Sequence, residues 1–460
     1  MPPQPGPGVL SADRNPGTGV LPADREPGTG VAPGGQPPPP VSAGRLAWLD
    51  ALRGLAVLFV VFDHLSTHVL RGPRGMITPW FDTGTYGVMV FFLVSGYIVP
   101  ASLERRGSVR RFWVGRVFRL YPMWVLAVAA VLILAVLGVA GLRGADEHPA
   151  SSAVAHMLML QDLLGIRDAV NVLWTLSYEM AFYLLLTFLF VVRVHRRSAG
   201  FAAGFAVAAL AVGGILPTQA LTGGDLGTRL VIIVTAAAIL AGLAAAVSGR
   251  QRMRLVGAVL VGGTTLLLIT LNGRAWGFES FSILAWMFSG TVVYRAERGE
   301  ISKAAAAVTC ALVLVLTAAS GVWNAAQWGG SQLVFQRSWV TTYVLAAATF
   351  AAAMVFWRRR APRFLAWVGL VSYSAYLLHP LLIDVFFGVP WTRGRDFSGA
   401  AGVTVAAAFL ACLLGCCWAA YRFVETPAQR LGRRLARWLD FRLGPDTAPP
   451  RQAAVPVTTR

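Results

Sequence analysis

Long apolar segments dominate this 460-residue chain. A helix needs about 20 predominantly apolar residues to cross the hydrocarbon core of a bilayer. Twelve segments meet or approach that length, near residues 50–70, 84–103, 118–140, 172–192, 200–217, 229–247, 255–271, 278–295, 304–322, 339–357, 364–388 and 399–421. Only 13% of the residues are charged, about half the share typical of soluble domains. We therefore predict an all-α, polytopic transmembrane helical bundle of about 10–12 spans, with 278–295 as the weakest of them.

The two ends of the chain differ in composition from the apolar region. Residues 1–44 are rich in Pro and Gly and repeat on themselves, as PGPGVLSADR and then PGTGVLPADR. Such a segment buries too little apolar surface to fold, and it lacks the basic and apolar regions of a signal peptide. We predict a disordered cytoplasmic tail over 1–44, a transmembrane domain over 45–430 and a cytoplasmic basic tail over 431–460.

The distribution of basic residues predicts the orientation. The formal net charge is +19, which in a soluble chain would raise nucleic acid as a partner. Here the arginines lie between apolar segments, which indicates topology determinants and contacts with anionic lipids rather than nucleic acid. One set of alternate connections holds 19 Lys and Arg residues and the other holds 9. The richer set is predicted to be cytoplasmic, which places both termini inside a multi-pass protein of the cell (inner) membrane.

Ionisable residues within predicted spans are costly and mark functional sites. Asp50, Arg53 and His64 fall in the first segment. An α-helix turns about 100° per residue, so Arg53 and His64, eleven positions apart, lie about 20° from eclipsed and about 16 Å apart along the axis. One helix is thus predicted to present a guanidinium near the cytoplasmic surface and an imidazole deep in the membrane.

Two further ionisable residues are predicted at a similar depth. Glu179 lies about 10 Å below the outer surface, and His379 lies about 22 Å above the inner one. Together with His64 they are expected to form one layer in the outer half of the membrane. Trp174 and Tyr178, close to Glu179 in the sequence, are either part of an acceptor pocket or ordinary interfacial and core aromatics.

A dense arginine cluster follows in the connection VRRFWVGRVFRLYP. Arg116 and Arg119 are three positions apart, so they face the same way on a helix. Guanidinium groups make bidentate contacts with phosphate, so the cluster suits a phosphate-bearing donor, although spacing alone favours positive-inside anchoring. The four cysteines have no partner at a zinc-binding spacing, and no metal site is predicted. Glu425 is expected to pair with Arg422 at the inner end of the last span.

Six segments in order resemble the acyltransferase-3 family of integral membrane acyltransferases. They are LDALRGLAVLFVVFDHL (49–65, Arg-x10-His), GVMVFFLVSGYI (87–98), FWVGRVFRLYP (112–122, Arg-x-x-Arg), NVLWTLSYEMAFYLL (171–185), VSYSAYLLHP (371–380) and FVETP (423–427). The resemblance covers nearly the whole apolar region. It implies transfer of an acyl group, commonly acetyl from acetyl-CoA, to a hydroxyl of a sugar, glycolipid or natural product.

The same resemblance implies roles for particular residues. His64 matches the residue expected to be catalytic, and Arg53, Arg116 and Arg119 match donor-site arginines. Members of the family acylate surface polysaccharides, peptidoglycan, macrolide sugars or glycolipids, and some carry a C-terminal hydrolase-like domain. The ten-helix core usual in the family is smaller than the twelve spans predicted here.

These observations predict a mechanism. The phosphates of an acyl-CoA bind Arg53, Arg116 and Arg119, and the thioester arm reaches upward to His64, which acts as a general base kept neutral by desolvation. Glu179 or, with a less suitable direction, Asp63 orients the imidazole, and Trp174, Tyr178 and His379 contact the acceptor. A covalent acyl-His64 intermediate is the alternative route. A secondary transporter or flippase, or a membrane scaffold, is the alternative class of protein.

Overall fold

The computed structural model describes residues 47–142, 147–248, 250–273, 276–389, 397, 399–444 and 446. The predicted disordered tail over 1–44 lies outside this part of the chain, as do residues 447–460. The described residues form helices and no β-strand, which confirms the all-α prediction.

All twelve predicted segments are helical, and the segment near 364–388 is divided into two helices. The helices are α1 (Ala47–Leu65), α3 (Thr83–Arg106), α4 (Val109–Val136), α6 (Trp174–Val191), α7 (Ser198–Ala211), α8 (Asp225–Ala246), α9 (Gln251–Leu271), α10 (Gly277–Glu297), α11 (Lys303–Trp323), α12 (Gln332–Phe356), α13 (Arg363–Leu370), α14 (Ser372–Gly388) and α15 (Gly399–Ala420). The connections carry the short helices α2 (Arg71–Ile77) and α5 (Pro149–Met157), and α16 (Thr426–Leu443) follows α15.

Fewer of these helices than predicted are long and apolar enough to cross a membrane. The described residues contain eight such helices, or nine if α13 and α14, which are bent by 73° at their break, count as one span. Three predicted spans do not qualify: α7 has only 14 residues, α1 carries Asp50, Arg53 and Asp63, and α10 mixes serines and Glu279 with its apolar residues. The polar groups of α1 and α10 are tolerated because both helices are largely enclosed by others.

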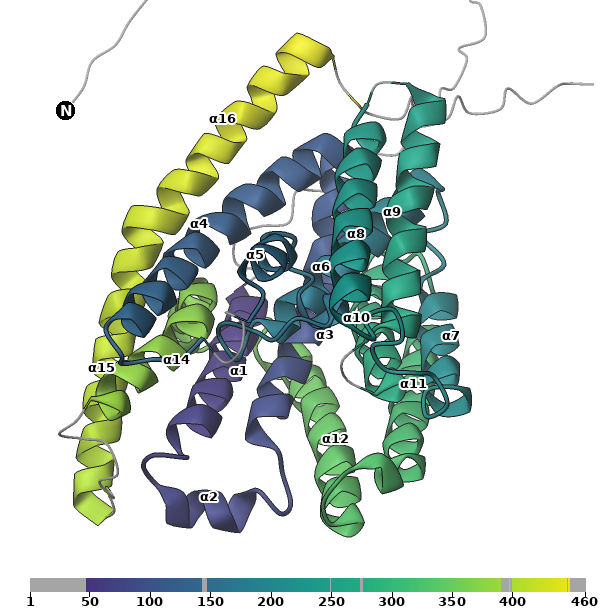
Figure 1. Cartoon of the computed structure of the whole chain (residues 1–460). Helices are drawn as coiled ribbons and strands as arrows, with labels where there is room; N and C mark the ends of the chain where they lie inside the picture. The colour runs from purple at the N-terminus through teal and green to yellow at the C-terminus, as the bar shows by residue number, and fades with distance from the viewer. Residues whose placement is uncertain are drawn as a thin grey trace, which may run out of the picture. The chain divides into compact units, whose positions relative to one another are not determined.

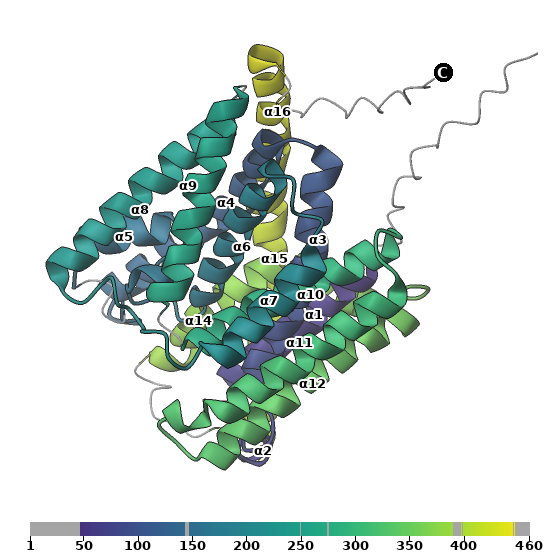
Figure 2. The same cartoon turned by 90° about the vertical axis from the view of Figure 1, so that its right-hand side faces the viewer.

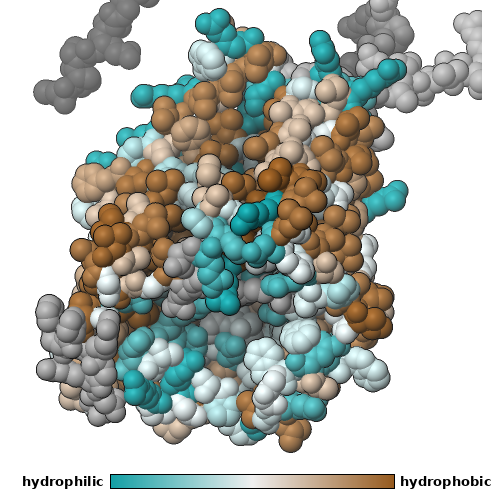
Figure 3. Space-filling view, in the orientation of Figure 1, coloured by the Kyte–Doolittle hydropathy of each residue, from teal (hydrophilic) through white to brown (hydrophobic). Residues whose placement is uncertain are grey.

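The helices divide into an inner and an outer group. The apolar windows of α3 and α6 are 83% and 72% buried, whereas those of α4, α8, α11 and α15 are only 28% buried. Exposed apolar side chains on so many long helices match a lipid-facing surface. Figures 1 and 2 show α8 and α9 as an outlying pair and α15 with α16 as one long rod. Figure 3 shows broad hydrophobic areas over the upper and middle parts of one face and hydrophilic residues at its lower end.

Small residues allow the inner helices to approach closely. Gly87 of α3 faces the Ala56 carbonyl of α1, and Gly96 of α3 faces the Met287 carbonyl of α10 so closely that an added Cβ would overlap it. The Thr291 hydroxyl donates a 2.8 Å hydrogen bond to the Gly96 carbonyl at the same crossing. Close contacts of this kind between glycine and a neighbouring backbone are typical of helix crossings in membranes.

Contacts join all five connections that were predicted to be cytoplasmic. The links are Glu104 Oε1 with His195 Nε2 (3.5 Å), Arg110 Nη2 with the Val247 carbonyl (3.3 Å), Arg295 with Glu104, and Arg358 with Glu297. The arginine-rich connections therefore lie at one end of the bundle, as their alternation along the chain requires. We call this the arginine-rich end.

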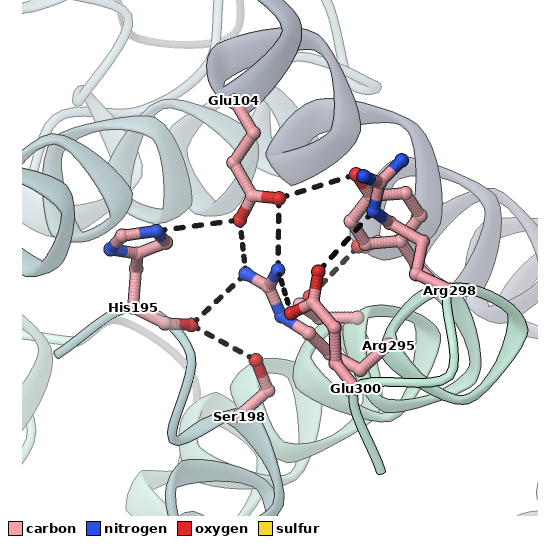
Figure 4. Close-up of polar contacts among 9 residues, drawn as sticks. Glu104, His195, Ser198, Arg295, Arg298 and Glu300 are labelled. Carbon is pink, nitrogen blue, oxygen red and sulfur yellow. Dashed lines mark hydrogen bonds and ion pairs between the residues drawn. The ribbon is translucent and has the colours of Figure 1, made fainter. Parts of the chain in front are cut away.

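The centre of these links is a buried ion-pair network (Figure 4). Glu104, at the end of α3, pairs through both carboxylate oxygens with Arg295 of α10, whose side chain is 1% exposed. Arg295 also bonds Glu300 at 2.8 Å, and the His195 carbonyl accepts from Arg295 at 3.3 Å. Burial is the main cause that lowers the pKa of His195, so its imidazole is neutral near pH 7 and adds little charge to the network.

Loss of Arg295 is expected to destabilise the fold strongly. Arg295→Ala leaves Glu104 without its buried partner, and breaking such a pair costs about 3–5 kcal/mol. The matched control is Arg298→Ala, because Arg298 bonds the same Glu300 from a half-exposed position. Thermal unfolding of the purified protein in detergent measures both variants. Equal losses of thermal stability would contradict a special role for the buried arginine.

The chain continues past residue 430 without a structural break. A π-helical turn at Tyr421–Glu425 joins α15 to α16, and α16 packs along α4, where Gly432 lies against the Phe118 side chain. Asp440 of α16 accepts a 2.6 Å bond from Arg111. The predicted basic tail is thus a docked helix through Leu443, and it places a row of arginines beside α4.

Candidate active site

A partly enclosed cavity opens where α1, α3, α4, α6 and α14 meet. Arg53 of α1, Arg116 and Arg119 of α4, and Glu179 of α6 all line it, together with Ser95 of α3, and it encloses about 670 Å³. The structure therefore brings together the three arginines proposed for the donor, although they come from two helices that are far apart in the sequence. We call this the arginine cavity.

Aromatic and acidic partners hold Arg116 in place. Its guanidinium carbon lies 5.2 Å from the ring centre of Phe112 and 4.9 Å from that of Tyr183, and Nη1 is 3.4 Å from the Tyr183 hydroxyl. That hydroxyl donates a short hydrogen bond to Glu179, which also accepts from Ser95 at 3.5 Å. The carboxylate thus balances the arginines from within the cavity, and Arg116 is oriented before any ligand arrives.

A second and larger hollow shares one lining residue with the arginine cavity. It encloses about 1670 Å³ between α4 and α16, and Arg119 lines both spaces. Its other basic residues are Arg106, Arg111, Arg430, Arg433, Arg434 and Arg437. We call it the basic groove. The shared Arg119 places it next to the arginine cavity, at the arginine-rich end.

His64 lies outside the arginine cavity, next to a second histidine. Its ring centre is 5.1 Å from that of His379, which in turn is 6.0 Å from the ring of Tyr376, a residue of the cavity wall. His64 Nδ1 is 2.9 Å from the Val60 carbonyl, and His379 Nδ1 is 2.9 Å from the Ala375 carbonyl. A carbonyl only accepts hydrogen bonds, so in both rings Nδ1 carries the hydrogen and Nε2 keeps its lone pair.

The acidic partner expected for His64 is not found at its ring. Glu179 belongs to the arginine cavity, and Asp63 accepts a 2.8 Å bond from Arg74 and a 3.0 Å bond from Thr83. Among the described residues, the ring in contact with His64 is that of His379. The packing of α6 explains the difference, because it sets the direction in which the Glu179 side chain points. Counting residues from the surface predicts only depth, and a similar depth did not bring Glu179 to the imidazole.

The two aromatics expected at an acceptor pocket differ in their surroundings. Tyr178 is fully buried and its hydroxyl is 2.8 Å from the Ser280 hydroxyl, so it packs in the core. Trp174 is partly exposed and contacts Tyr178 edge to face. The neighbours that line the arginine cavity are instead Thr175 and Leu176.

Some residues of the site were missed by sequence reasoning. Tyr373 and Tyr376 line the arginine cavity, although no role beyond their motif was predicted for them, whereas Tyr183, considered with Trp174 and Tyr178 as a possible pocket aromatic, bonds Glu179. The arginines of α16 were assigned to a tail, although their spacing of three and four residues predicts one helical face.

The expected ion pair at the end of the last span is replaced by another contact. Glu425 is buried and accepts a short hydrogen bond from Ser374 of α14. Its position in the π-helical turn directs the carboxylate inward, so the prediction that it closes the helix end with Arg422 is corrected.

A family model for the acyltransferase-3 domain matches residues 46–422. This chain therefore belongs to the acyltransferase-3 family, as the sequence motifs predicted. No solved structure matches the chain.

Curated relatives give the match a biological setting. The chain is 29% identical over 152 residues to a protein of Listeria monocytogenes named peptidoglycan O-acetyltransferase OatA. The aligned region makes up 30% of this chain and 23% of that protein. It is 31% identical over 186 residues to nodulation protein 10 of Rhizobium leguminosarum, which covers 37% of this chain and 50% of that protein. These alignments span at most half the length of either relative.

Proposed function

We propose that this protein transfers an acyl group from an acyl-CoA to a hydroxyl of a carbohydrate-bearing acceptor, with the acceptor a glycan, a glycolipid or a glycosylated natural product. The observation that carries the proposal is the cluster of Arg53, Arg116 and Arg119 in one cavity, of which Arg119 also lines the basic groove. The family match and the relative named as a peptidoglycan O-acetyltransferase support the same reaction class.

The basic residues suit the donor better than any other substrate of such a reaction. Coenzyme A carries three phosphates on its nucleotide end and a thioester at the end of a long, uncharged arm. The exposed basic groove fits the phosphates, because guanidinium groups bind them through paired hydrogen bonds. The arginine cavity, with its apolar walls of Val88 and Phe92, fits the arm. The arginine-rich end then faces the cytoplasm, where acyl-CoA is found.

His64 acts as the general base through Nε2. This nitrogen takes the proton of the acceptor hydroxyl while the oxygen attacks the thioester carbonyl carbon. The carbon–sulfur bond then breaks, and the coenzyme A thiolate leaves with the proton returned from the imidazolium. The hydrogen bond from Nδ1 to Val60 fixes the tautomer that this step needs. His379, with Nε2 unpartnered among the described residues, borders the ring that becomes charged.

Glu179 acts on the donor side of the site. It was predicted to orient His64, but its hydrogen bonds to Tyr183 and Ser95 support a role in orienting Arg116. Arg53 has Glu179 and Asp50 as acidic neighbours. We therefore assign Glu179 as a positioning residue that offsets the repulsion among the three arginines.

The reaction is tested in proteoliposomes that contain the purified protein, radiolabelled acetyl-CoA and a glycan acceptor. Label transferred to the glycan with release of free coenzyme A thiol supports the proposal. Label retained on the protein when the glycan is omitted, and absent from His64→Ala, would favour the covalent acyl-His64 route over direct transfer. Absence of transfer to any hydroxyl acceptor would refute the proposed function.

Removal of two arginines from the basic groove is expected to weaken donor binding selectively. Arg430→Ala with Arg433→Ala should raise the KM for acetyl-CoA about tenfold, since a hydrogen bond to a charged group contributes about 1.5–3 kcal/mol and these residues are partly screened by water. The KM for S-acetyl-pantetheine, which lacks the nucleotide, should not change. Arg442→Ala is the matched control, because Arg442 lies on α16 against Trp438 and outside the groove. An equal effect on both donors would contradict phosphate binding here.

A further inference from the structure

A third cavity lies at the end of the bundle opposite the arginine-rich end. It encloses about 1110 Å³ between the α1–α2–α3 region on one side and α12 on the other. Figures 1 and 2 both show α2 and the start of α12 at the lower end, away from the junction of α3 and α4. Asp63, which precedes His64 in the chain, lines this cavity. We call it the lower cavity.

One wall of the lower cavity is a continuous aromatic surface. Phe335, Trp339 and Tyr343 recur every four residues along one face of α12, and neighbouring ring centres are 5.6 Å and 4.8 Å apart. Trp328 extends the row, because it stacks on Phe335 at 4.8 Å with nearly parallel rings. Trp328 is 51% exposed, so the row runs from the surface into the cavity, where Trp339 and Tyr343 are buried.

The opposite wall is acidic and hydrogen-bonding. Asp63 pairs with Arg74, and Asp82 accepts 2.8 Å bonds from the amide and the hydroxyl of Thr85. Each carboxylate has about four lone-pair sites, so each keeps capacity for further donors. Glu279 of α10 also lines the cavity. An apolar aromatic wall facing several oxygen acceptors matches the two kinds of surface on a sugar ring, which has flat C–H faces and a rim of hydroxyl groups.

Two buried hydroxyl groups of the wall have no partner. Thr342 and Tyr343 are 1% and 0% exposed, and neither hydroxyl oxygen has a hydrogen-bond partner among the described residues. Both residues line the lower cavity. Both oxygens are themselves closed off from solvent, so these residues line the cavity through their other atoms and do not present a hydroxyl to it.

We infer that the lower cavity binds a saccharide unit of the acceptor. The aromatic row of α12 packs against the C–H faces of the sugar, and the carboxylates of Asp63 and Asp82 accept hydrogen bonds from its hydroxyl groups. Donor and acceptor thus enter from opposite ends, with His64 next to Asp63 at the acceptor side. This inference deepens the proposed function and depends on it for the identity of the ligand as an acceptor.

Saccharide binding is tested without any donor, so the test is separate from transfer. The probes are tetrasaccharides of β-1,4-linked N-acetylglucosamine, cellotetraose and maltotetraose, added to the full chain in detergent. Binding is followed by tryptophan fluorescence and by calorimetry. We expect at least one probe to bind, with the Kd raised about tenfold in Trp328→Ala and in Asp82→Asn, which removes the negative charge of the hydrogen-bond acceptor but keeps the size of the side chain. Trp323→Ala is the matched control, since Trp323 is 79% exposed and lies outside the cavity.

The possible outcomes separate this inference from the proposed function. If no probe binds, or if Trp323→Ala weakens binding as much as the cavity variants, the inference is wrong. If transfer occurs and the cavity variants leave the acceptor KM unchanged, the inference fails while the proposed function stands. If saccharide binds at this cavity but no acyl group is transferred, the binding site stands and the proposed reaction fails. Thermal unfolding checks that each variant is folded.

Discussion

Replacement of His64 by Asn is expected to lower kcat by a factor of about 10² to 10⁴, the range that a general base contributes. Asn keeps a hydrogen-bonding side chain of similar length but has no lone-pair nitrogen to accept the proton. The KM for acetyl-CoA should change little, because His64 is not in the wall of the arginine cavity. Steady-state rates of thiol release in proteoliposomes measure both constants.

The matched control for this prediction is His68→Asn. His68 lies one turn beyond His64 and stacks on Phe387 with ring centres 4.6 Å apart, so its loss removes a ring contact without touching the proposed base. Added imidazole should restore part of the activity of His64→Asn if the variant is folded. It would restore no activity to a variant that has lost its fold. Retention of more than a tenth of the wild-type kcat in folded His64→Asn would refute the assignment.

Replacement of Arg119 by Ala is expected to raise the KM for acetyl-CoA about 10- to 100-fold. This residue is shared by the arginine cavity and the basic groove, so a donor extended through both must pass it. A hydrogen bond between charged groups contributes about 1.5–3 kcal/mol, and each 1.36 kcal/mol corresponds to a factor of ten. The KM for the acceptor should remain close to that of the wild type.

Arg105→Ala provides the comparison for Arg119→Ala. Arg105 is exposed at the end of α3 and lines neither space, so it shares the charge and the end of the bundle but not the site. A rise in donor KM of the same size in both variants would mean that overall positive charge, and not Arg119 itself, attracts the donor. In that case the increase should also vanish at high salt, where long-range attraction is screened.

The sequence located most of the helices and three arginines that share one cavity. Twelve apolar segments predicted helices at twelve places because a bilayer-spanning chain must satisfy its own backbone hydrogen bonds. The alternation of arginine-rich connections predicted that they share one end, and Glu104, Arg110 and Arg358 make the contacts that join them. The spacing of Arg116 and Arg119 placed both on one face, and both line the same cavity.

Partnerships across helices were harder to predict. Glu179 was matched to His64 by depth alone, but its rotation about the axis of α6 directs it to Tyr183 and the arginines. His379 was predicted at the right layer, and the structure adds that it is the ring beside His64. Depth follows from counting residues, whereas direction depends on how neighbouring helices pack, so the count alone does not identify a partner.

Composition and periodicity by themselves determined that this chain is a helical membrane bundle with a basic end, because apolar length and arginine placement act locally along the chain. Only the tertiary structure decided that α16 docks on α4, that Arg119 joins two hollows, and that Trp328, Trp339 and Tyr343 share one cavity wall. Those arrangements depend on close packing between helices that are separate in the sequence, such as the glycine contacts of α3 with α1 and α10, which no local pattern specifies.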